Sequence, residues 1–222
     1  MKKFLRDNGL SIVMLGLFFV AFIFGQAYAG YLEDNEERSE HGQRILGFCE
    51  YLGSAHFMEA TMENWESEFL QMGVFVFLTA FLYQKGSAES KDPEKREEVD
   101  RDPRRVRDKK DAPWPVRRGG WILRIYEHSL SLSFLALFLS SFFLHAASGR
   151  SLYNEEQIAH GQLPVTFLEY LASSRLWFES FQNWQSEFLA IGAMVILTIF
   201  LRQKGSPESK PVDAPHSATG KG

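Results

Sequence analysis

The sequence predicts an all-α membrane protein with four transmembrane helices, arranged as two tandem hairpins. Three observations lead to this fold class. Most of the 20 phenylalanines lie in a few long apolar runs, and charged residues are crowded between those runs. A long segment is repeated at a constant offset, and lysine and arginine are distributed unequally between alternate connecting segments. Because a charge at the bilayer centre costs about 3 kcal/mol or more, this segregation is typical of a membrane protein.

The repeat defines the organisation of the chain. Residues 65–91, WESEFLQMGVFVFLTAFLYQKGSAESK, recur 119 positions later, from 65 to 184, as WQSEFLAIGAMVILTIFLRQKGSPESK. A fixed offset indicates a duplicated structural unit. We therefore expect two similar hairpins related by a pseudo-two-fold axis along the membrane normal. The predicted parts are a first hairpin at 1–86 with an outer loop at 30–64, a charged linker at 87–120, a second hairpin at 121–205 with an outer loop at 148–183, and a disordered tail at 206–222.

The first predicted span is the uncharged run at residues 10–29, LSIVMLGLFFVAFIFGQAYA. A helix of twenty residues is about 30 Å long, which matches the hydrocarbon thickness of a bilayer. The end Ala27-Tyr28-Ala29 also resembles a signal-peptidase site, so cleavage after Ala29 is the alternative. The equivalent apolar run in the second half favours a retained anchor.

The other three spans are predicted at residues 69–83, 129–147 and 188–201. The second and fourth are short for a bilayer, so we expect both helices to start earlier, with Asn64 as the N-cap of the second. Between the first two spans, the mixed segment 45–62 has apolar positions that suit a short amphipathic helix at the interface.

Charge counting predicts the orientation. Three Lys or Arg precede residue 10, thirteen lie between residues 85 and 124, and four follow residue 201, whereas each outer loop has only two. The positive-inside rule therefore places both termini and the linker in the cytoplasm. The linker has several prolines and almost no large apolar residues, so we expect it to be disordered or loosely bound to the surface.

Four motifs resemble a bacterial family of four-pass membrane proteins that is described only as a domain of unknown function. They are the opening FLRDNGLS, the NEE-x-x-x-HGQ loop, the N-W-x-S-E-F helix start and the QKGS-x-ES-K helix exit, and all but the first occur twice. The resemblance covers nearly the whole chain except the linker and the tail. It implies a location in the bacterial plasma (inner) membrane and implies no activity, cofactor or catalytic residue.

Two matched outer loops form the first candidate site, for a divalent metal. Glu and His side chains four residues apart face the same side of a helix, and two such pairs could hold zinc, manganese or two irons. The alternative is that each His, which is followed by Gly-Gln, ends a short helix, where a cation is favoured. The candidate ligands are Glu36, Glu37 and His41, with their copies Glu155, Glu156 and His160.

An acidic residue near the outer boundary of each short span forms the second candidate site. Glu68 and Glu187, with Thr79 and Thr198 on the same helix faces, could form an ion pathway. The alternative is that each acid lies in the first helical turn and contacts lipid headgroups. His145 lies inside the third predicted span, but Gln26 stands at the equivalent first-half position, so a haem held between matched histidines has no support.

Tryptophans and basic residues indicate contacts with lipid. Trp65 and Trp184 are predicted interface anchors, and Trp114 and Trp121 could mark the return of the chain to the membrane. The basic cluster at residues 104–110 could attract anionic lipids. Acidic residues are interleaved with it, so we do not expect nucleic-acid binding.

The sequence has no nucleophile–base pair, no phosphate-binding loop and no paired-cysteine metal motif, and the single Cys49 excludes an intrachain disulfide. We therefore expect a non-enzymatic membrane protein that acts as a scaffold, a partner subunit or an envelope component, with membrane lipids, a second copy or another protein as its partners. One alternative is a small transporter or channel that uses Glu68 and Glu187. Another is a metal-dependent membrane enzyme, or a metal-binding protein, that uses the Glu/His loops.

Overall fold

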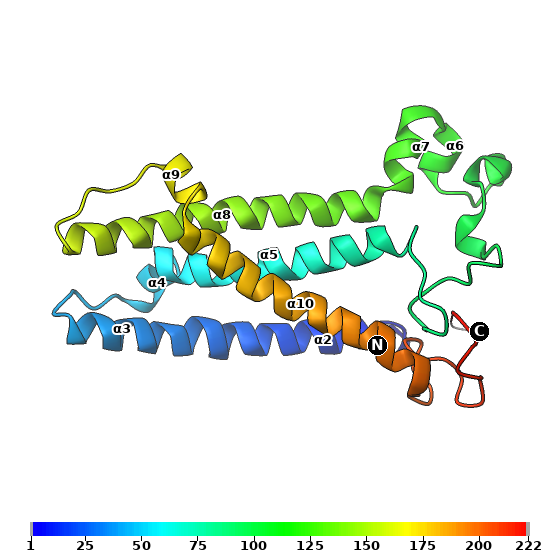
Figure 1. The fold of residues 1–222 in the computed structure, drawn as a ribbon, viewed down its shortest axis with the longest axis horizontal. Helices are drawn as coiled ribbons and strands as arrows, with labels where there is room; N and C mark the ends of the chain where they lie inside the picture. Colours follow the sequence, from blue (N-terminus) through cyan, green and yellow to red (C-terminus); the bar gives the residue numbers. More distant parts are fainter. Residues whose placement is uncertain (1, 221–222) are drawn as a thin grey trace. The chain divides into compact units, whose positions relative to one another are not determined.

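The computed structural model describes residues 2–220, and within that range every regular element is a helix. This confirms the all-helical prediction. In chain order (Figure 1), the elements are α1 (Lys2–Asp7), α2 (Gly9–Val20), η1 (Ala21–Ala29), α3 (Gly30–Glu40), α4 (Phe48–Tyr51), α5 (Ala55–Leu78), η2 (Glu98–Asp100), η3 (Pro103–Val106), α6 (Trp114–Arg118), α7 (Gly120–Glu127), α8 (Ser129–Ala159), α9 (Phe167–Leu171) and α10 (Ser174–Phe200).

Among the described residues, three helices are long and apolar enough to cross a membrane: Gly9–Glu40, Ser129–Ala159 and Ser174–Phe200. The first runs unbroken through α2, η1 and α3. Helix α5 is also long, but it carries Glu63, Glu66 and Glu68 near its middle. These acidic residues make it too polar to count among the helices that could cross a membrane. The structure thus identifies three candidate spans where the sequence predicted four.

Helices α5 and α10 both start before their apolar runs, as expected, but the predicted N-cap of α5 is wrong. Helix α5 begins at Ala55, so Asn64 is not its N-cap; the Asn64 amide donates to the Ala60 carbonyl at 2.7 Å inside the helix. Helix α10 likewise begins at Ser174, well before residue 188. The sequence from Ala55 to Asn64 contains no glycine or proline, so nothing interrupts the helix as it leaves the apolar run. Both helices therefore extend into the predicted outer loops and replace the separate interfacial helix.

The chain divides into two compact units, one of residues 1–64 and 141–177 and one of residues 65–140 and 178–222. The first unit contains two small hydrophobic cores. One gathers Ala27, Tyr51 and Phe57, and the other gathers Ala146, Tyr170 and Leu176. Each core is centred on a tyrosine that is almost completely buried, with 1 % exposure for Tyr51 and 0 % for Tyr170. Each tyrosine ring packs closely against the other residues of its core.

The two NEE-x-x-x-HGQ loops of this unit repeat the same hydrogen bonds. The Asn35 amide donates to the Leu46 carbonyl at 3.1 Å, and the Leu46 N–H donates back to Asn35 Oδ1 at 2.7 Å. Asn154 and Val165 make the corresponding bonds at 3.1 and 2.7 Å. The asparagine of each NEE-x-x-x-HGQ motif therefore fastens the loop to the helix that precedes it.

Burial of Tyr51 leads to a prediction about alkaline pH. Burial, with the charges of Asp34 and Glu33, raises the pKa of Tyr51 to about 12. The unfolded chain releases this proton near its ordinary pKa of about 10. The fold therefore favours the protonated phenol, and this contribution to stability is present below pH 10 and is lost as the pH rises towards 12.

We expect ultraviolet titration of the detergent-solubilised protein to show a late tyrosinate transition, which Tyr51→Phe removes. The exposed Tyr126 offers a control, because Tyr126→Phe should leave the late transition in place. A Tyr51→Phe variant with an unchanged titration curve would contradict the assignment.

In the second unit, the QKGS-x-ES-K motifs form the same turn twice. The Gln84 N–H donates to Ser90 Oγ at 2.9 Å, and the Gln203 N–H donates to Ser209 Oγ at 3.0 Å. Each serine thus closes the chain shortly after its helix ends. The motif residue Lys91 then pairs with Asp100 at 2.6 Å.

The tail forms turns around a buried lysine, whereas its composition predicts disorder. Lys210 is 2 % exposed. Its ammonium donates to the carbonyls of Gly86 at 2.5 Å, Ala218 at 2.8 Å, His216 at 3.0 Å and Pro215 at 3.4 Å. Composition alone could not reveal this arrangement, because a single charged side chain organises it.

Candidate metal centre

The matched Glu/His loops do not form a ligand cluster among the described residues. His41 and His160 are exposed, and each ends a helix. The His41 Nδ1–H donates to the Glu37 carbonyl at 2.9 Å, and the His160 Nδ1–H donates to the Glu156 carbonyl at 2.7 Å. These are the contacts of a helix-ending histidine, the alternative that the following Gly-Gln suggested.

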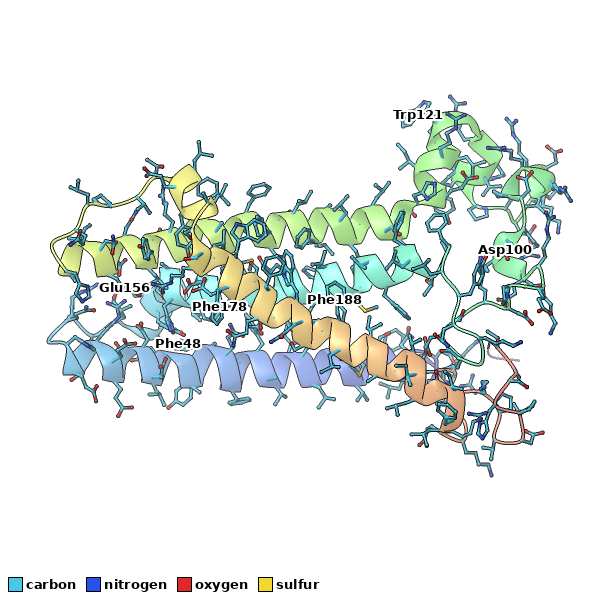
Figure 2. The ribbon with its side chains drawn as sticks, in the orientation of Figure 1. Phe48, Asp100, Trp121, Glu156, Phe178 and Phe188 are labelled. Atoms are coloured by element: carbon cyan, nitrogen blue, oxygen red, sulfur yellow. The ribbon has the colours of Figure 1, made fainter. Side chains whose placement is uncertain are left out.

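The acids of these loops have local roles or face solvent. Glu156, near the end of α8 (Figure 2), forms a two-pronged ion pair with Arg175 at 2.5 and 3.1 Å. Glu36, Glu37 and Glu155 are exposed. The loops are therefore ordered by pairs within the chain and hold no group of converging ligands in the described part.

A different pair of side chains could contribute to a metal site, namely Glu59 and His145. Glu59 lies on α5 and His145 on α8, both in the first unit, and their ligand atoms lie within 4.8 Å of each other.

The pair is largely shielded from water. His145 is 0 % exposed, and the Glu59 side chain is half-buried. The atoms Glu59 Oε1 and His145 Nε2 are both inaccessible to solvent. A charged group in such a place costs free energy unless an opposite charge compensates it.

Gly149 forms part of the wall of this site. A Cβ atom at this position would lie 2.5 Å from the Tyr170 hydroxyl oxygen and 2.8 Å from Glu59 Oε1. The absence of a side chain on α8 therefore lets Tyr170 and Glu59 come against its backbone. Tyr170 is itself held by Ala146 and Leu176, so the hydrophobic core fixes one side of the site.

The chemistry of the pair suits a divalent transition metal. An imidazole nitrogen and a carboxylate oxygen are ligand types that zinc, manganese and ferrous iron accept. Two protein ligands leave coordination positions open for water or other small ligands.

Sequence reasoning singled out His145 but not Glu59. The comparison of the two halves concealed Glu59, because the equivalent position, 119 residues later, holds Phe178. The usable signal was an acid among apolar residues, once the second helix is extended into the outer loop.

The residues of the proposed ion pathway lie in the second unit. Glu68 is exposed and Glu187 is half-buried, and the Gln71 amide donates to the Glu187 backbone carbonyl at 2.7 Å. The hydroxyl of Thr79 donates to the Val76 carbonyl at 3.1 Å. Thr198 is buried and hydrogen-bonds to the Ser87 hydroxyl at 3.0 Å. Both threonines are therefore engaged by the surrounding chain.

The two predicted interface anchors, Trp65 and Trp184, are half-buried. Trp65 packs edge-to-face against Phe69, with ring centroids 6.3 Å apart. Trp184 packs in the same way against Phe138 at 6.0 Å and Phe181 at 5.2 Å. Their role as anchors stays a prediction.

These features define a class of protein: an all-helical chain, three of whose helices are apolar enough to cross a membrane, with a partly buried Glu/His cluster. The chain belongs to the family of the domain of unknown function DUF6766, whose model matches residues 1–221. No curated protein and no solved structure matches it.

Proposed function

We propose that this chain is a four-pass protein of the bacterial inner membrane, whose outer half binds a divalent transition-metal ion through Glu59 and His145. The fourth pass is α5, which is 24 residues long and ends in the apolar run that precedes the first exit motif. Of the 24 Lys and Arg residues, all but the two in each outer loop lie on the side of the termini and linker, which supports cytoplasmic termini. The repeated loops and exit turns support two similar hairpins.

The single observation that carries the metal proposal is the approach of the fully buried His145 imidazole and the Glu59 carboxylate to within 4.8 Å, with Glu59 Oε1 shielded from solvent. Membrane helices seldom carry such groups without a functional reason, because each ionised side chain costs free energy to bury. An exposed acidic cluster carries no such cost.

The open coordination position distinguishes this function from a purely structural one. Structural zinc sites are closed by four protein ligands, whereas sites that bind or transform a further ligand keep one position free. A site with fewer than four protein ligands thus favours a metal-binding membrane protein over a passive scaffold. If no metal binds, the scaffold or partner-subunit role expected from the sequence is the remaining function.

The test is metal analysis of the full-length protein, purified in detergent with a tag that does not bind metals. We expect about one zinc, manganese or iron ion per chain in the wild type. The double variant Glu59→Gln/His145→Ala should lose at least about tenfold of this content, because both ligands are removed. The single variant Glu59→Gln, which keeps the shape of the side chain, should weaken binding without removing a helix contact.

The matched control is His41→Ala/His160→Ala, which removes two exposed histidines of the outer loops and should retain the metal. Circular dichroism of each variant shows whether the helices are kept. A wild-type protein that stays metal-free after incubation with zinc and manganese would overturn the proposal, as would full metal content in the double variant.

A further inference from the structure

Two short helices before the third span present exposed aromatic side chains. Helices α6 and α7 pack on each other within the second unit, and Val116 and Leu123 are buried, at 6 % and 3 % exposure. Trp114 and Trp121 point away from this small core and are 60 % and 71 % exposed (Figure 2 shows Trp121). Large exposed aromatic residues of this kind are typical of contact with a membrane surface or a partner.

The same region is strongly basic. Residues 101–124 contain nine Lys or Arg and three Asp or Glu, a net charge of +6. Arg107 is tied to the helix pair, because its Nε–H donates to the Arg117 carbonyl at 2.9 Å. The exposed basic side chains of this segment and of α6 and α7 are Arg104, Arg105, Lys109, Lys110, Arg117, Arg118 and Arg124.

The chain itself identifies the surface that this region faces. Only His128 separates the end of α7 at Glu127 from the start of α8 at Ser129. Helix α8 is one of the three helices that can cross a membrane. Helices α6 and α7 are therefore tethered within a few residues of the bilayer, at the end of α8 where the basic residues gather.

We propose that α6, α7 and the basic segment before them form a docking surface for the anionic phospholipid headgroups of the cytoplasmic leaflet. Trp121 and Ile125, four residues apart on α7, enter the interface, and the surrounding lysines and arginines bind phosphates. Tryptophan favours the headgroup level, and clustered basic residues beside a span favour anionic lipid. This inference requires α8 to cross the membrane and is independent of the metal.

The test places the full-length protein in lipid nanodiscs of phosphatidylcholine with increasing fractions of phosphatidylglycerol, and measures quenching of tryptophan fluorescence by brominated lipids. The difference between the wild type and Trp114→Phe/Trp121→Phe reports this surface alone. We expect that difference to rise at least about twofold with anionic lipid and to fall again in high salt, because screening weakens the attraction.

Two charge variants complete the design. Neutralising Arg104, Arg105, Lys109 and Lys110 to glutamine should return quenching to its level in phosphatidylcholine. The matched control neutralises the exposed Lys85, Lys95, Arg96 and Lys204, which changes net charge equally but should keep the response to anionic lipid. Circular dichroism confirms that both variants keep their helices.

Quenching that is independent of phosphatidylglycerol would overturn the proposal, and so would an equal loss of response in both charge variants. Binding of an RNA oligonucleotide that depends on the same four residues, without a lipid response, would assign the surface to nucleic acid instead.

Discussion

Gly149→Ala is expected to destabilise the first unit by about 2–3 kcal/mol and to lower the metal content of the protein. The new methyl group would lie 2.5 Å from the Tyr170 hydroxyl oxygen and 2.8 Å from Glu59 Oε1. The Glu59 side chain is flexible at its end, but Tyr170 is a rigid ring with 0 % exposure and cannot easily move aside. Thermal unfolding in detergent and metal analysis would measure the two effects.

A second substitution isolates the cause. Tyr170→Phe removes the closest atom, so Gly149→Ala/Tyr170→Phe should be more stable than the sum of the single effects predicts, by about 1 kcal/mol or more. Gly16→Ala is the control, since a Cβ there meets nothing within 4 Å and alanine favours a helix. A Gly149→Ala protein with wild-type stability and metal content would show that α8 and Tyr170 are not in contact.

Lys210→Met is expected to release the C-terminal tail. Methionine keeps much of the length of lysine but donates no hydrogen bond, so the carbonyls of Gly86, His216 and Ala218 lose their buried donor. Each unsatisfied buried carbonyl costs about 1–3 kcal/mol, and a net loss near 3 kcal/mol would raise the undocked population roughly 100-fold. Limited proteolysis of the full-length protein should show a corresponding increase in cleavage beyond α10.

Lys204→Met is the matched control for the tail, because Lys204 is exposed and lies in the same exit motif. It should be cleaved at the wild-type rate. Equal cleavage of Lys210→Met and wild type would mean that the hydrogen bonds from Lys210 to the backbone carbonyls do not hold the tail in solution.

The tail and α5 show why sequence reasoning failed locally. A polar composition predicts disorder on average, yet in the tail a single buried ammonium organises the turns through Gly86, which lies far away in the chain. For α5, the apolar run set the expected start near Asn64, although helix propensity continues back to Ala55. Hydrophobicity marks where a helix would meet lipid, and it does not mark where the helix ends.

The sequence alone determined the features that depend on neighbouring residues. These are the helical class, the repeated loops in which Asn35 and Asn154 bond eleven residues ahead, and the exit turns closed by Ser90 and Ser209. Such interactions are encoded locally, so a repeated motif forms a repeated structure.

Only the tertiary structure decided which chemical groups meet. Glu59 and His145 lie on helices far apart in the chain, at positions that the repeat does not relate, and their approach depends on the close contact at Gly149. The apolar pattern of a helix specifies the face that is buried, but not its register against a neighbour. In the folded protein, Glu59 and Tyr170 both lie against Gly149, Glu59 lies close to His145, and the more conspicuous His41 and His160 lie at helix ends.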